Sequence, residues 1–146
     1  MSEFSYALNE LEHLKDFEEF RVISIGCGPA PDLMALEEFR HENELPIGLK
    51  YRGFDLNKYW TPIHHQIERY CQKAKQMNAK FYCEDAMEVF AQTDFPNANI
   101  LVLQYVISHF HNTQQFNQLR QFFESIADNI ISKMLRPSVV IIHDIN

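Results

Sequence analysis

The sequence predicts an α/β fold: a doubly wound, mostly parallel sheet of about five strands with helices on both faces. Two observations predict it. Short runs rich in valine, isoleucine and leucine alternate along the chain with longer segments whose apolar residues recur every three or four positions. The short runs are apolar throughout, which is typical of strands buried on both faces, and the helical segments supply the crossovers that parallel strands require.

The first half of the chain is predicted to contain a leading helix and two strand–helix units. Pro31 and Asp32 fit the first turn of a helix, because proline is tolerated there and an acid favours the helix dipole. Thr61 followed by Pro62 fits a helix N-cap and first helical position. The predicted elements are a helix over 4–17, a strand over 21–25 that ends at Gly26, a helix from Pro31, a strand over 49–55, and a helix from Thr61 to about Met77.

The second half is predicted to contain three more strands. Asn112 and Gln115 are spaced like a capping box at the start of a long helix, which Pro137 ends. The apolar stripe of that helix predicts a core-facing side made of Phe116, Leu119, Phe122, Phe123, Ile126, Ile130 and Met134. The other predicted elements are a strand over 79–83, a brief helix over 87–90, a strand over 99–105 and a strand over 139–142.

Length and composition indicate one domain over residues 1–146, since about 150 residues is an ordinary domain size. Thirteen basic against twenty acidic side chains give a net charge of −7, which argues against nucleic-acid or anionic-membrane partners. No apolar run approaches the roughly 20 residues of a membrane span, and no secretory signal begins the sequence. Three scattered cysteines suit a reducing compartment, so we expect a cytoplasmic protein.

A ligand site is expected where the predicted strands end, because ligands of open α/β sheets bind at the carboxyl ends of the strands. Gly26-Cys27-Gly28-Pro29-Ala30-Pro31 follows the first strand, and its glycines allow the backbone to approach a ligand closely. Asp55 follows the second strand, Asp85 the third, and Gln104 with Tyr105 the fourth. Taken singly, the glycine turn also fits a purely structural turn, and each aspartate fits a helix cap.

These residues resemble the motifs of the class I, Rossmann-like S-adenosylmethionine-dependent methyltransferases, over about residues 21–144. The resemblance implies a leading helix over 1–20 and a cofactor-binding core over 21–146. It also implies that one molecule of S-adenosyl-L-methionine is bound through three groups of residues. Gly26, Cys27 and Gly28 would lie under its methionine part, Asp55 at its ribose with Leu56 beside the adenine, and Asp85 with Ala86 at the adenine amino group. Gln104 and Tyr105 would line the passage between cofactor and methyl acceptor.

Three features depart from that family. Ser24 stands where the family usually has an acid, and Ala30 where it usually has a third glycine. Asp32 is a candidate to replace the acid. The sequence also stops before the C-terminal β-hairpin that usually completes the sheet, so it is a piece of a longer protein, a minimal domain, or a domain whose open sheet edge a partner covers. Homodimerisation through that edge is a hypothesis. The fourth motif, Leu103-Gln104-Tyr105-Val106, differs from that of the base-methylating enzymes.

A general base is needed only if the methyl acceptor must lose a proton. His109 and His111, just past the fourth strand, are the candidates, and Asp144 at the end of the fifth is another. More often, side chains in such positions are solvated or bonded to the backbone, without a catalytic role. His64 and His65 are adjacent and point different ways on a helix, so no metal site is expected. Cys27 lies near a helix start, which would lower its pKa, although we interpret it as a turn residue.

The predicted function is methyl transfer from S-adenosyl-L-methionine to a small-molecule or protein acceptor. Two alternatives remain. A nicotinamide-dependent oxidoreductase requires Gly-x-Gly-x-x-Gly, and Pro31 occupies the last position here. A non-catalytic module would keep the fold and the cofactor but serve as a sensor or assembly domain, which Ser24 and Ala30 favour.

Overall fold

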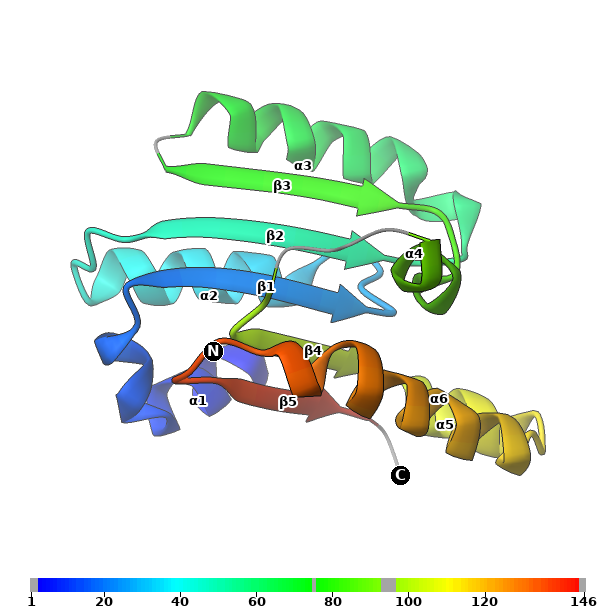
Figure 1. Ribbon diagram of the computed structural model, residues 1–146. Helices are drawn as coiled ribbons and strands as arrows, with labels where there is room; N and C mark the ends of the chain where they lie inside the picture. Colours follow the sequence, from blue (N-terminus) through cyan, green and yellow to red (C-terminus); the bar gives the residue numbers. More distant parts are fainter. Residues whose placement is uncertain (1–2, 75, 93–96, 145–146) are drawn as a thin grey trace.

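The computed structural model describes residues 3–74, 76–92 and 97–144, and these form one five-stranded parallel sheet (Figure 1). The strands are β1 (Glu19–Ile25), β2 (Gly48–Phe54), β3 (Met77–Tyr82), β4 (Ile100–Gln104) and β5 (Val139–His143). Their order in the sheet is β3-β2-β1-β4-β5, and every neighbouring pair is parallel. The predicted fold class is therefore confirmed.

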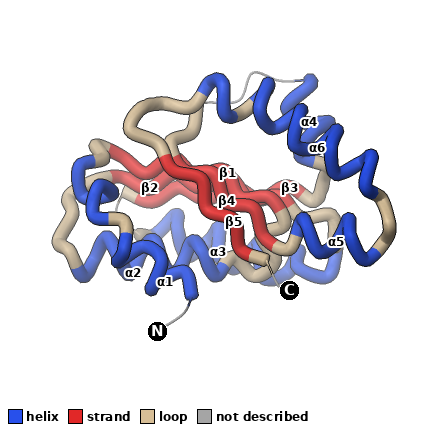
Figure 2. Tube along the Cα trace, turned by 90° about the horizontal axis from the view of Figure 1, so that it is seen from below, coloured by secondary structure: helices blue, strands red, loops and turns tan. Residues whose placement is uncertain are grey.

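Helices cover both faces of the sheet (Figure 2). On one face lie α1 (Glu3–Glu10), α2 (Pro31–Glu42) and α3 (Thr61–Lys73), and on the other α4 (Ala86–Gln92) and α6 (Phe116–Asn129). Alternate side chains of each central strand enter different cores: Val22 packs with the α1 and α2 side, and Ile23 with the α6 side. This alternation is why most positions of the central strands are apolar, as in the Ile-Leu-Val-Leu of β4.

The central strand β1 decides where a ligand can bind. β2 lies on one side of β1 and β4 on the other, so the chain winds outward in both directions from it. The loops after β1 and β4 consequently diverge to opposite faces of the sheet, and ligands of open α/β sheets bind at the carboxyl ends of the strands at such a point. The glycine turn after Ile25 opens at this switch point.

The third helix differs from the prediction at both ends. Its N-cap is Trp60, which closes the short 3₁₀ turn η2 (Lys58–Trp60), so Thr61 is already helical and does not cap with its side chain. The helix ends at Lys73 rather than near Met77. Met77 instead pairs with Leu49 and is the first residue of β3, so the chain joins the sheet before another helical turn can form.

The long helix predicted from about Asn112 to Pro137 is shorter, α6 (Phe116–Asn129), and a helix that was not predicted precedes it. Val106–Asn112 forms α5, and the Thr113 hydroxyl donates to the His109 carbonyl (2.8 Å) to close it. Asn112 therefore ends one helix, and Gln115 is the N-cap of α6 without a side-chain bond, so the predicted capping box is absent. The stripe residue Phe116 is 56% exposed rather than core, whereas Ile126 and Ile130 are buried.

The remaining elements are two short 3₁₀ turns. The leading helix breaks after Glu10, and η1 (Glu12–Asp16) continues its apolar stripe with Leu14 buried. After α6, η3 (Ile131–Lys133) leads to β5. Within the described ranges, no helix is both long enough and apolar enough to cross a bilayer.

Candidate functional site

The glycine turn is wedged between two strands at the carboxyl edge. The amides of Gly26 and Cys27 both donate to the carbonyl of Phe54, at 2.8 and 3.1 Å. Gly26 has φ +73°, and a Cβ on it would lie 2.6 Å from the carbonyl oxygen of Gln104. Gly28 has φ +51°, and a Cβ there would meet only the Trp60 indole, at 3.9 Å. Gly26 is thus required by backbone packing, and Gly28 leaves space beside the turn.

Asp55 organises the turn. Its Oδ2 accepts a hydrogen bond from the Gly28 amide (2.8 Å) and its Oδ1 one from the Asn57 amide (2.9 Å). The structure therefore brings together two of the predicted site residues, Gly28 and Asp55, from separate strand ends. Each carboxylate oxygen keeps a second lone pair, and the side chain is half-exposed, so it can still accept from a ligand hydroxyl.

The loops after β2 and β3 lie side by side at this edge. The Asp55 amide donates to the Tyr82 carbonyl (3.1 Å), which places Asp55 next to the start of the Asp85 loop. Asp85 is exposed, and its Oδ1 accepts from the Met87 amide (2.9 Å), so it caps the start of α4. Ala86 is buried beneath it, whereas Leu56 is 69% exposed, an unusual exposure for leucine at a strand end.

The end of β4 lies on the opposite side of β1 from Asp55. Gln104 is buried and its Nε2 donates to the Ser24 hydroxyl oxygen (3.2 Å), so these two predicted polar positions satisfy each other. Tyr105 has φ +57° and is 44% exposed. Its ring lies 5.1 Å from that of His143 at the end of β5. Tyr105 is therefore a surface aromatic in a backbone conformation that non-glycine residues rarely adopt.

His64 is a structural member of the site that the sequence analysis missed. It is buried, and its Nε2 lies 2.7 Å from the Gly28 carbonyl, to which it donates. Its ring stacks on Phe81 at 4.1 Å. The glycine turn is thus hydrogen-bonded to His64 of α3 as well as to Asp55. The sequence did contain a signal that His64 is buried. It precedes Ile67 and Cys71 by three and seven residues, so the three side chains share one face of the helix.

A buried polar cluster lies under the turn. Asp32 is 1% exposed, and its Oδ1 accepts from the Tyr51 hydroxyl (2.9 Å) while Oδ2 has no hydrogen-bond partner. Burial raises the pKa of Asp32, although hydrogen bonds from Ser24 and Tyr51 oppose that shift. Burial, together with the charges of Asp32 and Asp55, also raises the pKa of Cys27. The expected lowering of the Cys27 pKa is therefore wrong, because desolvation outweighs the nearby helix start.

The proton-transfer candidates occupy different surroundings from those expected. His109 and His111 are exposed side chains within α5, not in a loop before a long helix. Asp144 accepts from the amides of Ile107 (2.8 Å) and Ser108 (3.2 Å), so it caps α5. In the described part of the chain, no group of three or more histidine, cysteine or acidic side chains is placed to hold a metal ion.

Comparison with known proteins supports the fold. Neither the family models nor the curated proteins contain a match to this sequence. Among solved structures, the chain is similar to the methyltransferase PaMTH1 of Podospora anserina bound to S-adenosylhomocysteine. The TM-score is 0.57 at 8% identity, and the match covers 97% of this chain and 53% of that one.

Two further solved structures are similar over less of the chain. They are MnmC2 of Aquifex aeolicus (TM-score 0.45, 17% identity, 63% of this chain and 34% of that one) and a putative S-adenosylmethionine-dependent methyltransferase of Methanococcus maripaludis (0.45, 14%, 71% and 42%). This chain thus spans about a third to a half of the length of these proteins. It has the Rossmann-like fold of the class I methyltransferases.

Proposed function

We propose that the protein binds S-adenosyl-L-methionine at the carboxyl edge and transfers its methyl group to a small-molecule or protein acceptor. The hydrogen bond from the Gly28 amide to Asp55 carries the proposal. It joins a glycine turn and an acid, 27 residues apart, at the switch point of a methyltransferase-like fold. Its likeness to PaMTH1, solved with S-adenosylhomocysteine, extends over almost the whole chain and supports the choice of cofactor.

The residues present fit the adenosine half of this cofactor. Asp55 has lone pairs left for the ribose hydroxyls, and exposed Leu56 offers an apolar contact for the adenine. Asp85 uses Oδ1 as a helix cap, which leaves Oδ2 to accept from the adenine amino group. Gly26, Cys27 and Gly28 hold the backbone open for the methionine half, and Asp32 lies beneath them, buried and bonded to Tyr51.

The cofactor supplies a methyl group on a sulfonium, which is electrophilic without further activation. The protein must therefore orient the acceptor in line with that methyl group and exclude water, and positioning of this kind is worth about 7–11 kcal/mol of barrier. Tyr105, exposed at the end of β4, is placed to contact the acceptor. His109 and His111 on α5 are the proposed proton acceptors for substrates that must be deprotonated.

Calorimetric titration of the protein with S-adenosylmethionine, S-adenosylhomocysteine and NAD tests the proposal. We expect both adenosyl compounds to bind and NAD not to, and Asp55→Asn to weaken binding about tenfold, since it loses a charged acceptor. Asp128→Asn, an exposed carboxylate on α6, is the matched control. The proposal would be refuted if neither S-adenosylmethionine nor S-adenosylhomocysteine bound.

A non-catalytic module is the second candidate. The bond between Ser24 and Gln104 favours it, because these side chains satisfy each other rather than a ligand. Tight cofactor binding without methyl transfer to any small-molecule or protein acceptor screened would support this candidate. Methyl transfer to an acceptor, reduced by Tyr105→Ala, would instead support the proposed methyltransferase activity.

A further inference from the structure

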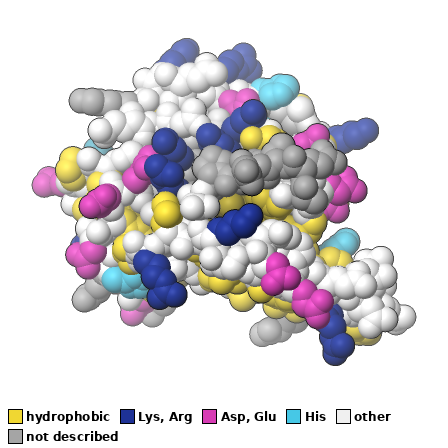
Figure 3. All heavy atoms as spheres, in the orientation of Figure 1, with side chains coloured by type: hydrophobic (Ala, Val, Ile, Leu, Met, Phe, Trp, Pro, Cys, Tyr) yellow, Lys and Arg dark blue, Asp and Glu magenta, His cyan; other side chains and the backbone are white. Residues whose placement is uncertain are grey.

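Charge is unevenly distributed along this acidic chain. Residues 56–83 contain five basic side chains and one acid, a net +4, and the other residues carry 8 basic and 19 acidic side chains, a net −11. The basic residues of this segment are Lys58, Arg69, Lys73, Lys75 and Lys80, of which Lys75 lies outside the described residues. Figure 3 shows Lys and Arg side chains along the edge where Figure 1 places α3. The net charge of the whole protein thus conceals a basic edge.

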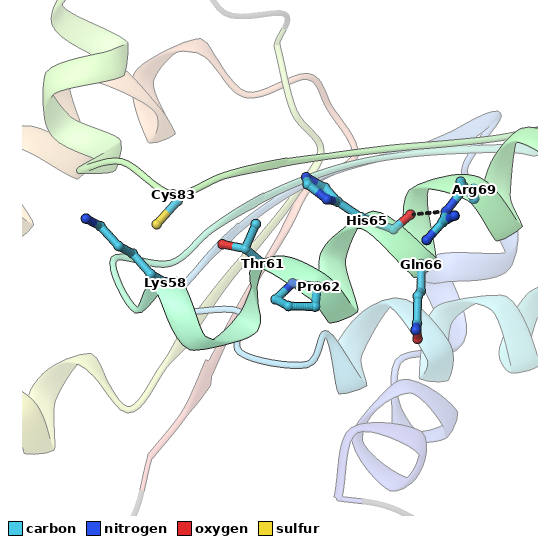
Figure 4. Close-up of a pocket in the computed structure, with 7 residues that line it drawn as sticks. All are labelled: Lys58, Thr61, Pro62, His65, Gln66, Arg69 and Cys83. Carbon is cyan, nitrogen blue, oxygen red and sulfur yellow. Dashed lines mark hydrogen bonds between the residues drawn. The ribbon is translucent and has the colours of Figure 1, made fainter.

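A groove runs along this edge. It has a volume of about 770 Å³ and is lined by Lys58, Thr61, Pro62, His65, Gln66, Arg69 and Cys83. Thr61, His65 and Arg69 are four residues apart on α3 and so share one side of the helix. Figure 4 places Lys58 and Cys83 at one end and Arg69 at the other, with His65 between them. None of the described residues that line the groove is acidic.

The cations of the groove are not neutralised by the protein. Within the described residues, neither Lys58 nor Arg69 has an acidic partner within 4 Å. The hydrogen bond of Arg69 goes to the His65 carbonyl at 3.4 Å. The nearby acid Glu68 is engaged by the Phe81 amide (2.9 Å). The first turn of α3, which opens on the groove, has neither an acidic residue nor a side-chain cap.

The length of the groove indicates a ligand with more than one anionic group. Thr61 and Arg69 are eight residues apart, which is about 12 Å along a helix. One phosphate cannot contact both ends, whereas a chain of linked phosphates or a short phosphodiester segment can. Tyr59, 77% exposed beside Lys58, adds a surface on which a base can stack.

We propose that the α3 groove binds a ligand carrying at least two linked phosphate groups, contacted by Lys58 at one end and Arg69 at the other. The groove adjoins Leu56, whose carbonyl accepts from the Cys83 thiol (3.7 Å), but it does not include the glycine turn and does not depend on the proposed methyl transfer. Two sources share this chemistry, a free oligophosphate such as a nucleoside polyphosphate and a nucleic-acid strand. The expectation of no nucleic-acid partner, drawn from net charge, does not extend to a local basic groove.

Titration with inorganic pyrophosphate and, separately, with a six-nucleotide oligouridylate tests the site. We expect binding that weakens as salt rises. Lys58→Gln and Arg69→Gln should each reduce affinity about fivefold, and the double variant more. Lys133→Gln, the same charge change on η3, is the matched control and should bind like wild type. Pyrophosphate binding alone would indicate a free oligophosphate, and tighter oligouridylate binding a strand.

Two outcomes would overturn the proposal: no binding of either probe at low salt, or binding that the Lys58 and Arg69 variants leave unchanged. Both side chains are exposed, so the urea midpoints of the variants should match that of wild type. S-adenosylhomocysteine titrated into the same variants reports the glycine-turn site independently. Failure of one site is therefore distinguishable from failure of the other.

Discussion

At the scale of single residues, the two glycines of the turn have different physical roles. Both have positive φ, but only Gly26 faces a neighbouring backbone at a distance that no side chain fits. Gly28 instead faces the Trp60 indole at ordinary contact distance and donates its amide to Asp55. The first glycine holds the strands together, and the second shapes the ligand site.

Alanine substitutions should separate these roles. Gly26→Ala should lower the free energy of unfolding by about 2–4 kcal/mol, since a methyl group would overlap the Gln104 carbonyl in addition to the cost of positive φ. Gly28→Ala should lower it by only about 1–2 kcal/mol, the backbone cost alone. Urea unfolding of both variants measures the difference. Equal losses would mean that the contact with Gln104 is not a constraint.

The buried carboxyl of Asp32 makes stability depend on pH. Burial raises its pKa in the folded state, so the folded protein holds this proton more tightly than the unfolded chain does. The contribution of this proton to the free energy of unfolding is fully present below the unfolded pKa of about 3.9. It is lost as pH rises through the raised pKa of the folded state. The stability of Asp32→Asn relative to wild type should therefore increase with pH between the unfolded and folded pKa values of Asp32, by about 1.4 kcal/mol for each pH unit.

Urea unfolding of wild type and Asp32→Asn between pH 4 and 8 measures this dependence. Asp128→Asn, which changes an exposed acid on α6, should show no such trend and serves as the control. A constant difference between Asp32→Asn and wild type over this range would contradict the argument.

At the scale of secondary-structure elements, α3 supports the turn after β1 through one side chain. His64 donates to the Gly28 carbonyl and stacks on Phe81 of β3, so it joins three elements. The glycine turn is therefore positioned by its own strand neighbours and by a helix from the next crossover. Movement of α3 would be transmitted directly to the candidate ligand site.

Replacing His64 tests this support. His64→Phe keeps the ring stack but removes the donor, and we expect a loss of about 1 kcal/mol in unfolding free energy together with weaker binding of S-adenosylhomocysteine. His65→Phe, at the exposed neighbouring position, should leave both quantities unchanged. Thermal unfolding and calorimetry provide the measurements. If the two variants behave alike, the turn does not depend on α3.

At the scale of the whole molecule, the two edges of the sheet differ in chemistry. The β3 edge carries Lys80, a charge of the kind that discourages strand pairing. β5 reads Val-Val-Ile-Ile-His and has no lysine or acid, and no described strand pairs with its outer side. Val140 is 43% and Ile142 52% exposed on the face that α6 leaves uncovered. We therefore propose the β5 edge as the surface to which a second copy adds.

Self-association should therefore depend on β5. We expect the wild-type protein to dimerise with rising concentration and Val140→Lys to remain monomeric, because the added charge would be desolvated on pairing. Met34→Lys places the same charge at another exposed apolar position, on α2, and should dimerise like wild type. Sedimentation equilibrium distinguishes these cases. Monomeric wild type at every concentration would refute this expectation.

The sequence was sufficient for the order of the five strands because strand burial and helix periodicity are local signals. Residues 21–25, 49–55 and 99–105 each contain most of a strand, and the glycine turn lies where it was expected. Helix α5 was missed because a loop was expected between the fourth strand and Asn112, and the capping box predicted for Asn112 and Gln115 does not form.

The internal contacts of the site could not be predicted in the same way. The bonds of Gly28 with Asp55 and His64 join residues 27 and 36 positions apart, and their geometry depends on how the sheet and α3 pack. The helix-cap interpretation of Asp85 was available from the sequence and proved correct. Burial also decided the direction of the Cys27 pKa shift, and burial is a property of the whole fold.

Trp60 gives the molecule a built-in optical reporter. It is the only tryptophan of the sequence, and its indole lies beside Gly28, with the Tyr59 ring 5.7 Å away. It closes the 3₁₀ turn that leads from Asp55 and Lys58 into α3. Indole emission is sensitive to local polarity, so occupancy of the glycine turn or of the α3 groove should change its wavelength or intensity. Ligand screens on this protein can therefore be read by intrinsic fluorescence, without an attached dye.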